Sequence, residues 1–391
     1  MGRSVQPWLT VRCAPKRRKM PTDDRDPQPR AVGTHARRVA VVGAGVAGLV
    51  CARVLHERGV EVVVFDKGRS PGGRLATRRV DGFAFDLGAQ YFTARDPRFR
   101  RWVTEWLTEG VVRRWSGRIG SVTEIGAAIV ETAPVERFVA VPDMPELARR
   151  LASELDVRSS RRVDVVERHG AKLVLRGAVG AAGETLGPRA PTDAAPGEAL
   201  GEFDALVVAL PPAQARSLVG SISSTIDVQL ASVVLDPCVA LGVGMAEGSP
   251  LGTLPFDGIF VGRDEDAART IAWISRDSSK PGRPRQEAWV IHAAPEWSRA
   301  HLRDTDASIG GALLDALAAI VGHRVASPLV TTLQRWAFAR PRDPLAVEGV
   351  FDDEVRVGVG GDWAAGGRVE GAFLSGLALA DRVGRWQVGQ K

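Results

Sequence analysis

The sequence contains few of the residues and runs from which disulfides, metal sites and membrane helices are built. It has three cysteines in 391 residues, at 13, 51 and 238, with no Cys-x-x-Cys pair, and its six histidines lack the spacing of metal ligands. We therefore expect no disulfide framework and no metal, and a reducing, cytoplasmic environment. The longest apolar run, 39–50, is broken by three glycines and is shorter than the roughly 18 residues of a membrane helix, so no membrane span is predicted.

Excess charge of one sign is confined to the N-terminal segment. Residues 1–38 hold ten Arg or Lys and three Asp, whereas the remainder holds 42 Arg or Lys and 43 Asp or Glu. We interpret residues 1–37 as a disordered basic tail. The balanced body gives no sign of nucleic-acid binding, and the sequence makes no prediction of oligomeric state.

What the chain does contain is a dinucleotide-binding pattern near its start. The β-branched run 39–42 precedes Gly-Ala-Gly-Val-Ala-Gly at 43–48, and a helical pattern then runs to Arg58. A second predicted strand, 61–65, is followed by Asp66. This order of strand, glycine loop, helix, strand and acid is typical of a Rossmann-like unit.

Each glycine of the pattern has a separate physical role. Gly43 allows a tight turn, Gly45 lets a pyrophosphate approach the backbone, and Gly48 lets the helix pack close to the strand. Asp66 follows Gly43 at about the distance expected for a carboxylate on the adenosine ribose. The candidate cofactor-binding residues here are Gly43, Ala44, Gly45, Val46, Ala47, Gly48, Asp66 and Lys67.

A second glycine pair indicates which dinucleotide is bound. Gly72 and Gly73 precede Arg74, within eight residues of Asp66. Such a loop can return to the pyrophosphate and neutralise it with the arginine. An NAD dehydrogenase does not need this loop, whereas an extended FAD does, so the sequence predicts FAD.

The C-terminal region supplies a further candidate cofactor contact. A strand, Gly361, Asp362 and a helix from about Val369 follow one another. Asp362 can accept hydrogen bonds from a ribityl hydroxyl, or it can serve as a structural cap. The first turn of the helix, Val369, Glu370, Gly371 and Ala372, directs backbone N–H groups and a positive dipole end at an anion such as a reduced flavin.

Several residues could line the substrate side of a flavin. Gln90 can hydrogen-bond a ring edge, and Tyr91 is the only tyrosine of the chain. Trp336, Phe338 and Trp363 could form walls. For Tyr91 and these three aromatics, packing in the core is an equally open interpretation. The sequence therefore names no catalytic residue.

Other segments carry simpler patterns. Residues 96–109 read as an amphipathic helix, 138–155 as a strand and a helix with Asp143 as N-cap, and 206–210 as a buried strand. Residues 178–201 are rich in Ala, Gly and Pro and read as a hairpin insertion.

We predict an α/β fold with two interleaved domains. A discontinuous Rossmann-like FAD-binding domain comprises 38–100, 145–213 and 347–388. An α+β substrate domain comprises 101–144 and 214–346.

The ordered set of motifs resembles the FAD-dependent oxidoreductases of the amine-oxidase superfamily, and within it the bacterial renalase-like proteins. The stretches that carry the resemblance run from 39 to about 383: VAVVGAGVAGLVCARVL, VVVFDKGRSPGGRLATRR, FDLGAQYFTARDPRF, VPDMPELARRLA, FDALVVALPPAQA, RWAFARP and GGDWAAGGRVEGAFLSGLALA.

This resemblance implies a fold of the glutathione-reductase/monoamine-oxidase type and non-covalent FAD. It also implies that a small-molecule substrate, a 2- or 6-dihydro isomer of NAD(P)H, gives hydride to flavin N5, with dioxygen as acceptor. It places the backbone of Val163 against the adenine.

Two alternatives remain: a flavin amine oxidase or desaturase, and a non-catalytic FAD-binding regulatory protein. Members that oxidise amines often use a buried lysine near N5. Here Lys67 lies in the predicted ribose loop, Lys172 and Lys280 in apparent turns, and Lys391 at the terminus. We therefore expect no buried lysine, which disfavours lysine-assisted amine oxidation.

Overall fold

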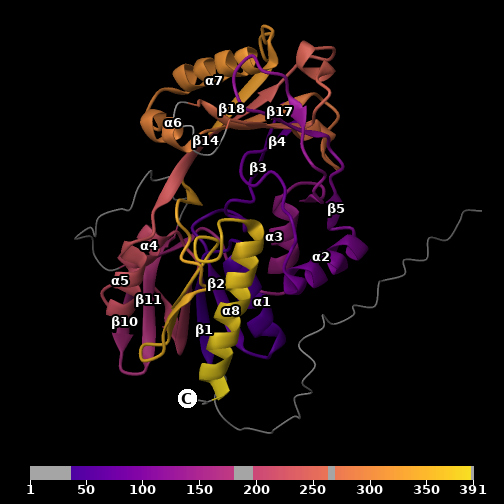
Figure 1. The fold of residues 1–391 in the computed structure, drawn as a ribbon. Coiled ribbons are helices and arrows are strands. Elements are labelled where there is room, and N and C mark those ends of the chain that lie inside the picture. The colour runs from indigo at the N-terminus through magenta and orange to yellow at the C-terminus, as the bar shows by residue number, and fades with distance from the viewer. Residues whose placement is uncertain (1–36, 180–196, 263–268, 389–391) are drawn as a thin grey trace, which may run out of the picture. The chain divides into compact units, whose positions relative to one another are not determined.

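The computed structural model describes residues 37–179, 197–262 and 269–388, which form two large β-sheets with helices packed against them (Figure 1). The predicted tail, Cys13 and most of the predicted insertion lie outside the described residues. In the part of the chain that is described, no helix is both long and apolar enough to cross a membrane.

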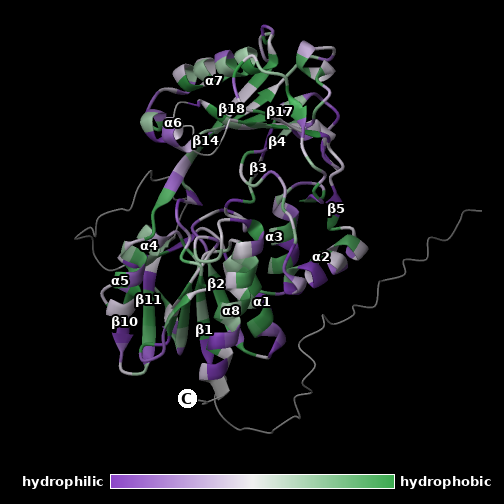
Figure 2. Cartoon of the chain, in the orientation of Figure 1, coloured by the Kyte–Doolittle hydropathy of each residue, from purple (hydrophilic) through white to green (hydrophobic). Residues whose placement is uncertain are grey.

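The first sheet is built on the strand that precedes the glycine loop. Its six strands are, in spatial order, β19 (Val350–Asp352), β20 (Val357–Val359), β13 (Ala205–Val208), β1 (Arg38–Val42), β2 (Glu61–Phe65) and β9 (Asp156–Arg158). All neighbours are parallel except β19 and β20. Strands buried on both faces need continuous apolar runs, and Figure 2 shows β1 and β2 coloured mainly as hydrophobic.

Helices cover this sheet. They are α1 (Val46–Glu57), α3 (Pro145–Ala152), α4 (Pro212–Val219), α5 (Ser224–Ala231) and α8 (Val369–Val388). Helix α1 packs against α3 and α8. A three-stranded antiparallel sheet of β10 (Arg161–His169), β11 (Lys172–Val179) and β12 (Glu198–Phe203) shares the hydrophobic core of the six-stranded sheet. The predicted β–α–β unit and the start of α8 are confirmed.

The second sheet has seven strands, in the order β18 (Val330–Pro341), β14 (Leu235–Gly244), β17 (Ala288–Ala293), β16 (Ile271–Arg276), β15 (Gly258–Val261), β6 (Ile119–Val122) and β7 (Val130–Glu131). All pairs are antiparallel except β15 with β6. Helix α7 (Asp306–Val321) buries Ile309, Leu313 and Leu317 in its core, and α6 (Pro295–His301) lies against β14.

Smaller elements join the two sheets: the hairpin β3 (Thr77–Val80) and β4 (Phe83–Asp86), helix α2 (Pro97–Glu109), the pair β5 (Val112–Arg114) and β8 (Phe138–Ala140), and the 3-10 turns η1 (Pro250–Thr253) and η2 (Asp277–Ser279). Two of these elements, β4 and α2, pack against different parts of the molecule. Phe83 and Phe85 of β4 pack on the seven-stranded sheet, whereas Phe99 of α2 packs 4.7 Å from Phe373 of α8.

Two local predictions need correction. The residue before α3 is Met144, and the Asp143 carboxylate accepts hydrogen bonds from Arg79 and Arg149 instead of capping the helix. Strand β13 ends at Val208 instead of Leu210, and the Leu210 carbonyl accepts the indole N–H of Trp363 at 3.0 Å.

Candidate functional site

The glycine loop between β1 and α1 adopts the geometry that its sequence predicts. Gly43 has φ +107°, and a Cβ there would lie 2.6 Å from the Ala209 carbonyl oxygen. A Cβ at Gly48 would lie 2.0 Å from the Gly43 oxygen, so only glycine lets α1 approach the turn. At Gly45 a Cβ would meet nothing within 4 Å, so this backbone is open to an incoming ligand.

The acid at the end of β2 is held against this loop. One Asp66 oxygen accepts the Ala44 N–H and the other accepts the Gly68 N–H, each at 2.6 Å. A carboxylate can accept about four hydrogen bonds, so Asp66 retains capacity for a ribose hydroxyl. Lys67 beside it is exposed.

The second glycine pair returns to the first loop. The Gly72 N–H donates to the Ala44 carbonyl at 2.9 Å, and a Cβ on Gly73 would lie 3.6 Å from the Gly45 Cα. Both glycines have positive φ, +137° and +55°. The two loops that were expected to flank one pyrophosphate are therefore adjacent.

Arg74 links this region to the C-terminal segment. Its guanidinium forms a two-pronged ion pair with Asp362, with N–O distances of 2.5 and 2.9 Å, and also donates to the Ala339 carbonyl at 2.9 Å. The two residues are 288 positions apart. The Arg74 side chain is one-third exposed, so part of its guanidinium remains accessible to a phosphate.

The start of α8 lies beside Asp362. The Ala372 N–H donates to the Arg368 carbonyl at 3.0 Å, so Val369, Glu370 and Gly371 form the first turn of α8, where backbone N–H groups generally lack a partner within the helix. The Glu370 carboxylate instead accepts the N–H groups of Arg95 and Asp96, at 2.5 and 2.7 Å. Glu370 thus holds the segment before α2, and the backbone of this turn is the part suited to an anion.

These observations test whether the residues fit a dinucleotide. An open glycine backbone, a second glycine loop against it, an accessible arginine and a helix N-terminus together match what an extended diphosphate needs. Two further expected site residues have these places in the structure. Val163 lies on β10 with its side chain buried in the core. Gly361 donates its N–H to the Ser375 hydroxyl at 2.9 Å.

Gln90 is not free to turn toward a ligand without breaking contacts. Its Oε1 accepts from the Lys280 ammonium at 3.1 Å, and its Nε2 donates to the carbonyls of Asp86 and Gly88. The amide is therefore fixed by a cluster that the sequence did not reveal.

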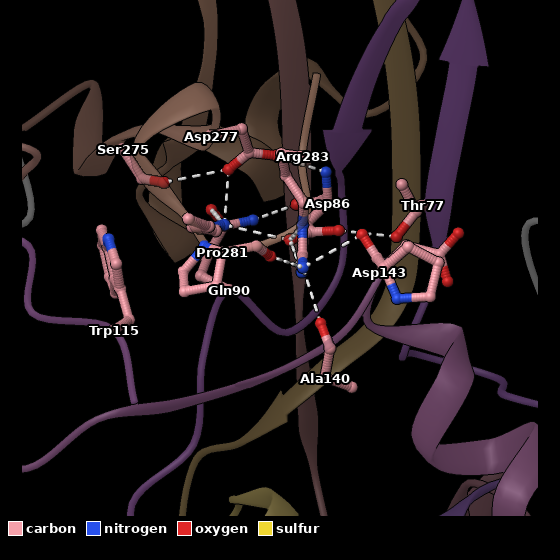
Figure 3. Close-up of polar contacts among 12 residues, drawn as sticks. Thr77, Asp86, Gln90, Trp115, Ala140, Asp143, Ser275, Asp277, Pro281 and Arg283 are labelled. Atoms are coloured by element: carbon pink, nitrogen blue, oxygen red, sulfur yellow. Dashed lines mark hydrogen bonds and ion pairs between the residues drawn. The ribbon is translucent and has the colours of Figure 1, made fainter. Parts of the chain in front are cut away.

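This Lys280 cluster comprises Asp86, Asp277, Lys280 and Arg283, and Figure 3 labels Asp86, Asp277 and Arg283. The Lys280 ammonium lies 2.5 Å from Asp277 Oδ1 and 3.2 Å from Asp86 Oδ2, and Arg283 Nη2 lies 2.7 Å from the same Asp86 oxygen. All four side chains are at most 1% exposed.

The environment moves the pKa values of the two carboxyls in opposite directions. Burial raises the pKa of Asp277, Lys280 opposes this, and the neighbouring Asp86 carboxylate adds to the rise. Burial also disfavours the charged form of Asp86, but Lys280 and Arg283 together bring the pKa of Asp86 below its ordinary value. The two cations of the cluster, Lys280 and Arg283, are therefore paired with carboxylates of the same cluster.

The expectation that no lysine is buried is wrong. Lys280 does lie in a turn after η2, but that turn is folded into the interior beneath β4. Two signals could have pointed to it: Asp86 interrupts an otherwise apolar strand, and Asp277 precedes Lys280 by three residues.

His292 borders the same cluster. Its Nε2 lies 3.4 Å from Gln90 Nε2. Burial, with a smaller contribution from the Lys280 charge, lowers the pKa of His292 to about 4, so the ring is neutral at pH 7. A neutral imidazole can accept or donate a hydrogen bond without adding charge.

The aromatic candidates separate into distinct environments. Trp363 is 1% exposed in the core of the six-stranded sheet. Trp336 is half-buried on β18 and donates its indole N–H to the Leu87 carbonyl at 2.8 Å, and Phe338 is half-buried on the same strand. Tyr91 packs between Trp115 and Trp273, with ring centroids 5.8 and 5.7 Å away.

Comparison with known proteins agrees with this architecture. Residues 41–106 match the family described as NAD(P)-binding Rossmann-like domain. A zeta-carotene-forming phytoene desaturase of Myxococcus xanthus is 50% identical over 58 residues, which are 15% of this chain and 11% of the relative. The aligned segment thus spans only about a tenth of the length of this curated relative.

Solved structures extend the similarity to most of the chain. A proposed protoporphyrinogen oxidase from Exiguobacterium sp. 255-15 superposes with a TM-score of 0.66 at 14% identity, covering 92% of this chain and 100% of that one. Cyclohexylamine oxidase from Brevibacterium oxydans IH-35A gives 0.66 at 12% identity, covering 89% and 99%.

At these identities the likeness establishes the fold. The chain is a mixed α/β protein with a Rossmann-like NAD(P)-binding domain and the architecture of amine-oxidase-like proteins, as predicted. Together the matches support assignment to the superfamily of FAD-type oxidoreductases. Among the described residues, no group of three or more His, Cys, Asp or Glu side chains is placed to bind a metal ion.

Proposed function

We propose that this protein is an FAD-dependent oxidoreductase acting on a small molecule. The observation that supports the proposal most directly is the Arg74–Asp362 ion pair, which joins the second glycine loop to the segment before α8. Two regions far apart in sequence and independently expected to contact FAD thereby meet. No cysteine follows Cys238 in the sequence, which is consistent with non-covalent binding.

The chain's own groups have separable tasks in this proposal. The open backbone at Gly45 admits the pyrophosphate, Arg74 neutralises it, and Asp66 accepts from the ribose. The N–H groups of Val369 to Gly371 face an anionic part of the cofactor. When bound, FAD supplies a hydride acceptor at N5, and dioxygen would regenerate it.

We further propose that the substrate is a dihydro-nicotinamide nucleotide of the 2- or 6-dihydro type. The resemblance of GAQYFTAR and GDWAAGGRVEGAFLSG to the renalase-like branch motivates this choice. Hydride donation by a dihydropyridine requires orientation and no general base. The buried groups near Gln90 suit such chemistry, because the Lys280 ammonium donates to three acceptors and the side-chain neighbour of His292 among the described residues is the Gln90 amide, which is not a base.

A second candidate is an amine oxidase or desaturase. Two observations favour it: the fold likeness to cyclohexylamine oxidase, and the discovery that Lys280 is buried. However, all three donors of the Lys280 ammonium have acceptors at Asp86, Asp277 and Gln90. Such a lysine is better suited to fixing Gln90 than to activating water.

The test begins with the visible spectrum of the purified protein. Anaerobic mixing with 6-dihydro-NAD(P), ordinary NADH and a panel of amines then follows flavin bleaching. We expect fast bleaching by the 6-dihydro isomer alone. Bleaching by an amine would establish the second candidate, and bleaching by none would favour a non-catalytic role. A colourless protein that does not reconstitute with FAD would refute cofactor binding.

A substitution tests the cofactor site itself. We expect Asp362→Ala to lose flavin on purification, because the ribityl acceptor and the partner of Arg74 disappear together. Asp381→Ala, on the exposed part of α8 where Asp381 pairs with Arg58, is the matched control and should stay yellow. Full flavin content in Asp362→Ala, measured by the absorbance ratio of flavin to protein, would remove Asp362 from the site.

A further inference from the structure

Arg137 is a buried cation that has no counterion among the described residues. It is 7% exposed and immediately precedes β8. One guanidinium nitrogen donates to the Val135 carbonyl at 3.1 Å, and the guanidinium carbon lies 5.2 Å from the centre of the Tyr91 ring. Within the described part of the chain its Nε has no hydrogen-bond partner, and no carboxylate pairs with it.

These contacts do not compensate a guanidinium for the loss of water. Burying an ion costs several kcal/mol even after relaxation. A cation–π contact returns about 0.5–2 kcal/mol, and one neutral hydrogen bond about 1 kcal/mol. Part of the free-energy cost of burying Arg137 is therefore uncompensated, and a negatively charged acceptor would compensate it.

Tyr91 also contacts a second side chain that has an unpartnered donor. The indole Nε1 of Trp273 is buried and has no acceptor among the described residues, and the Trp273 ring is 5.7 Å from that of Tyr91. Trp115 completes this group, 5.8 Å from Tyr91. We call Tyr91, Trp115, Arg137 and Trp273 the Arg137 cluster: three flat rings, two unused buried donors and no opposing carboxylate.

The Arg137 cluster adjoins the expected flavin edge. Tyr91 follows Gln90 directly and is half-buried, so a ligand can reach the cluster there. The Trp115 indole N–H donates to the Ser279 hydroxyl at 3.0 Å, and the Lys280 ammonium is 5.7 Å from the centre of the Trp115 ring. Because the Lys280 charge is already paired with carboxylates, the charge that favours an anionic ligand here is that of Arg137.

We propose that the Arg137 cluster is the substrate-binding site, and that it takes a planar compound bearing a phosphate. Arg137 and Trp273 donate to the phosphate, and the aromatic side chains contact the ring. This inference rests on the proposed function and sharpens it, because a cationic amine would meet an uncompensated guanidinium. It assigns selectivity for a phosphorylated dihydro-nicotinamide to residues outside the cofactor loops.

The test measures equilibrium binding by calorimetry to the flavin-loaded protein. The probes are nicotinamide mononucleotide, which carries a phosphate, and nicotinamide riboside, which lacks it. We expect the wild type to prefer the mononucleotide. Arg137→Met should weaken mononucleotide binding about 10- to 100-fold, the range of one charge-assisted interaction, and leave riboside binding unchanged.

Arg113→Met is the matched control, since Arg113 lies exposed on β5, which pairs with β8. It should bind both probes like the wild type. Equal affinities of the wild type for the two probes, or an unchanged mononucleotide affinity in Arg137→Met, would overturn the proposal.

Thermal unfolding distinguishes a binding role from a structural one. If Arg137 is kept for a ligand, Arg137→Met should melt at the same temperature as the ligand-free wild type or higher, because methionine removes an uncompensated charge. If Arg137 is structural, the melting temperature should fall and both probes should be affected alike.

The two proposals can fail separately. Arg137-dependent binding of the mononucleotide without flavin bleaching by any dihydro isomer would retain the site and reject the reaction. Bleaching by a dihydro isomer together with mononucleotide binding that does not depend on Arg137 would retain the reaction and reject the site.

Discussion

Two buried clusters contact the adjacent residues Gln90 and Tyr91, and their cations differ in how they are paired. In the Lys280 cluster, two cations face two carboxylates at 2.5–3.2 Å. In the Arg137 cluster, one cation faces aromatic rings and backbone, with unused donors. Burial is similar in both, so the difference is in pairing alone.

This comparison separates charge that serves the fold from charge that is available to a ligand. A paired cluster is destabilised when one member is removed, because the remaining charges are left without partners. An unpaired cation can be removed at little cost to stability but at a cost to binding. The predictions below test this distinction, in order of expected effect.

The largest effect is expected for Lys280→Met. Asp86 and Asp277 would keep their burial and lose their shared ammonium, so the free energy of unfolding should fall by about 3–5 kcal/mol. Urea unfolding at pH 7 measures this. The double variant with Asp277→Asn should recover part of the loss, and an unchanged midpoint in Lys280→Met would contradict the paired description.

The next effect concerns pH and His292. Its pKa is lowered from 6.5 to about 4 in the folded state, so the unfolded chain binds the proton more readily. Stability from this group is present above pH 6.5 and is lost as pH falls toward 4, by about 3 kcal/mol at most. The wild type should therefore lose more stability than His292→Asn between pH 7 and 4.5; parallel profiles would show that the imidazole contributes nothing.

The smallest effect tests the link between the clusters. Ser279→Ala leaves the buried Trp115 indole N–H without its acceptor, which should cost about 1 kcal/mol. Affinity for nicotinamide mononucleotide should fall less than in Arg137→Met. Calorimetry and urea unfolding of the same sample report both quantities, and a loss as large as that of Arg137→Met would assign the phosphate contact to Trp115.

The features that could be predicted from sequence are those whose chemistry is local. The glycines at 43, 45 and 48 are spaced by the geometry of one turn and one helix, so their pattern fixes their structure. The start of α8 is equally local. The Arg74–Asp362 pair was expected only in part: both residues were expected at the cofactor, but not in contact with each other.

The two cation clusters could not be predicted because they depend on contacts between segments far apart in the sequence, which for Lys280 with Asp86 and Gln90 are 194 and 190 residues apart. Lys280 meets Gln90 and Asp86 only because β4 packs on the seven-stranded sheet. Likewise, which described residues surround Arg137 is decided by the tertiary fold. No local sequence pattern indicates that none of them is a carboxylate paired with it.

The Arg74–Asp362 pair also has a consequence for the order in which the molecule can be assembled. Strand β20 and α8 are synthesised long after the glycine loops, yet β20 pairs with β13 beside β1. Until then the sheet has an open edge, and Arg74 has no carboxylate partner. A ligand that binds only the completed sheet would therefore stabilise the folded chain by mass action.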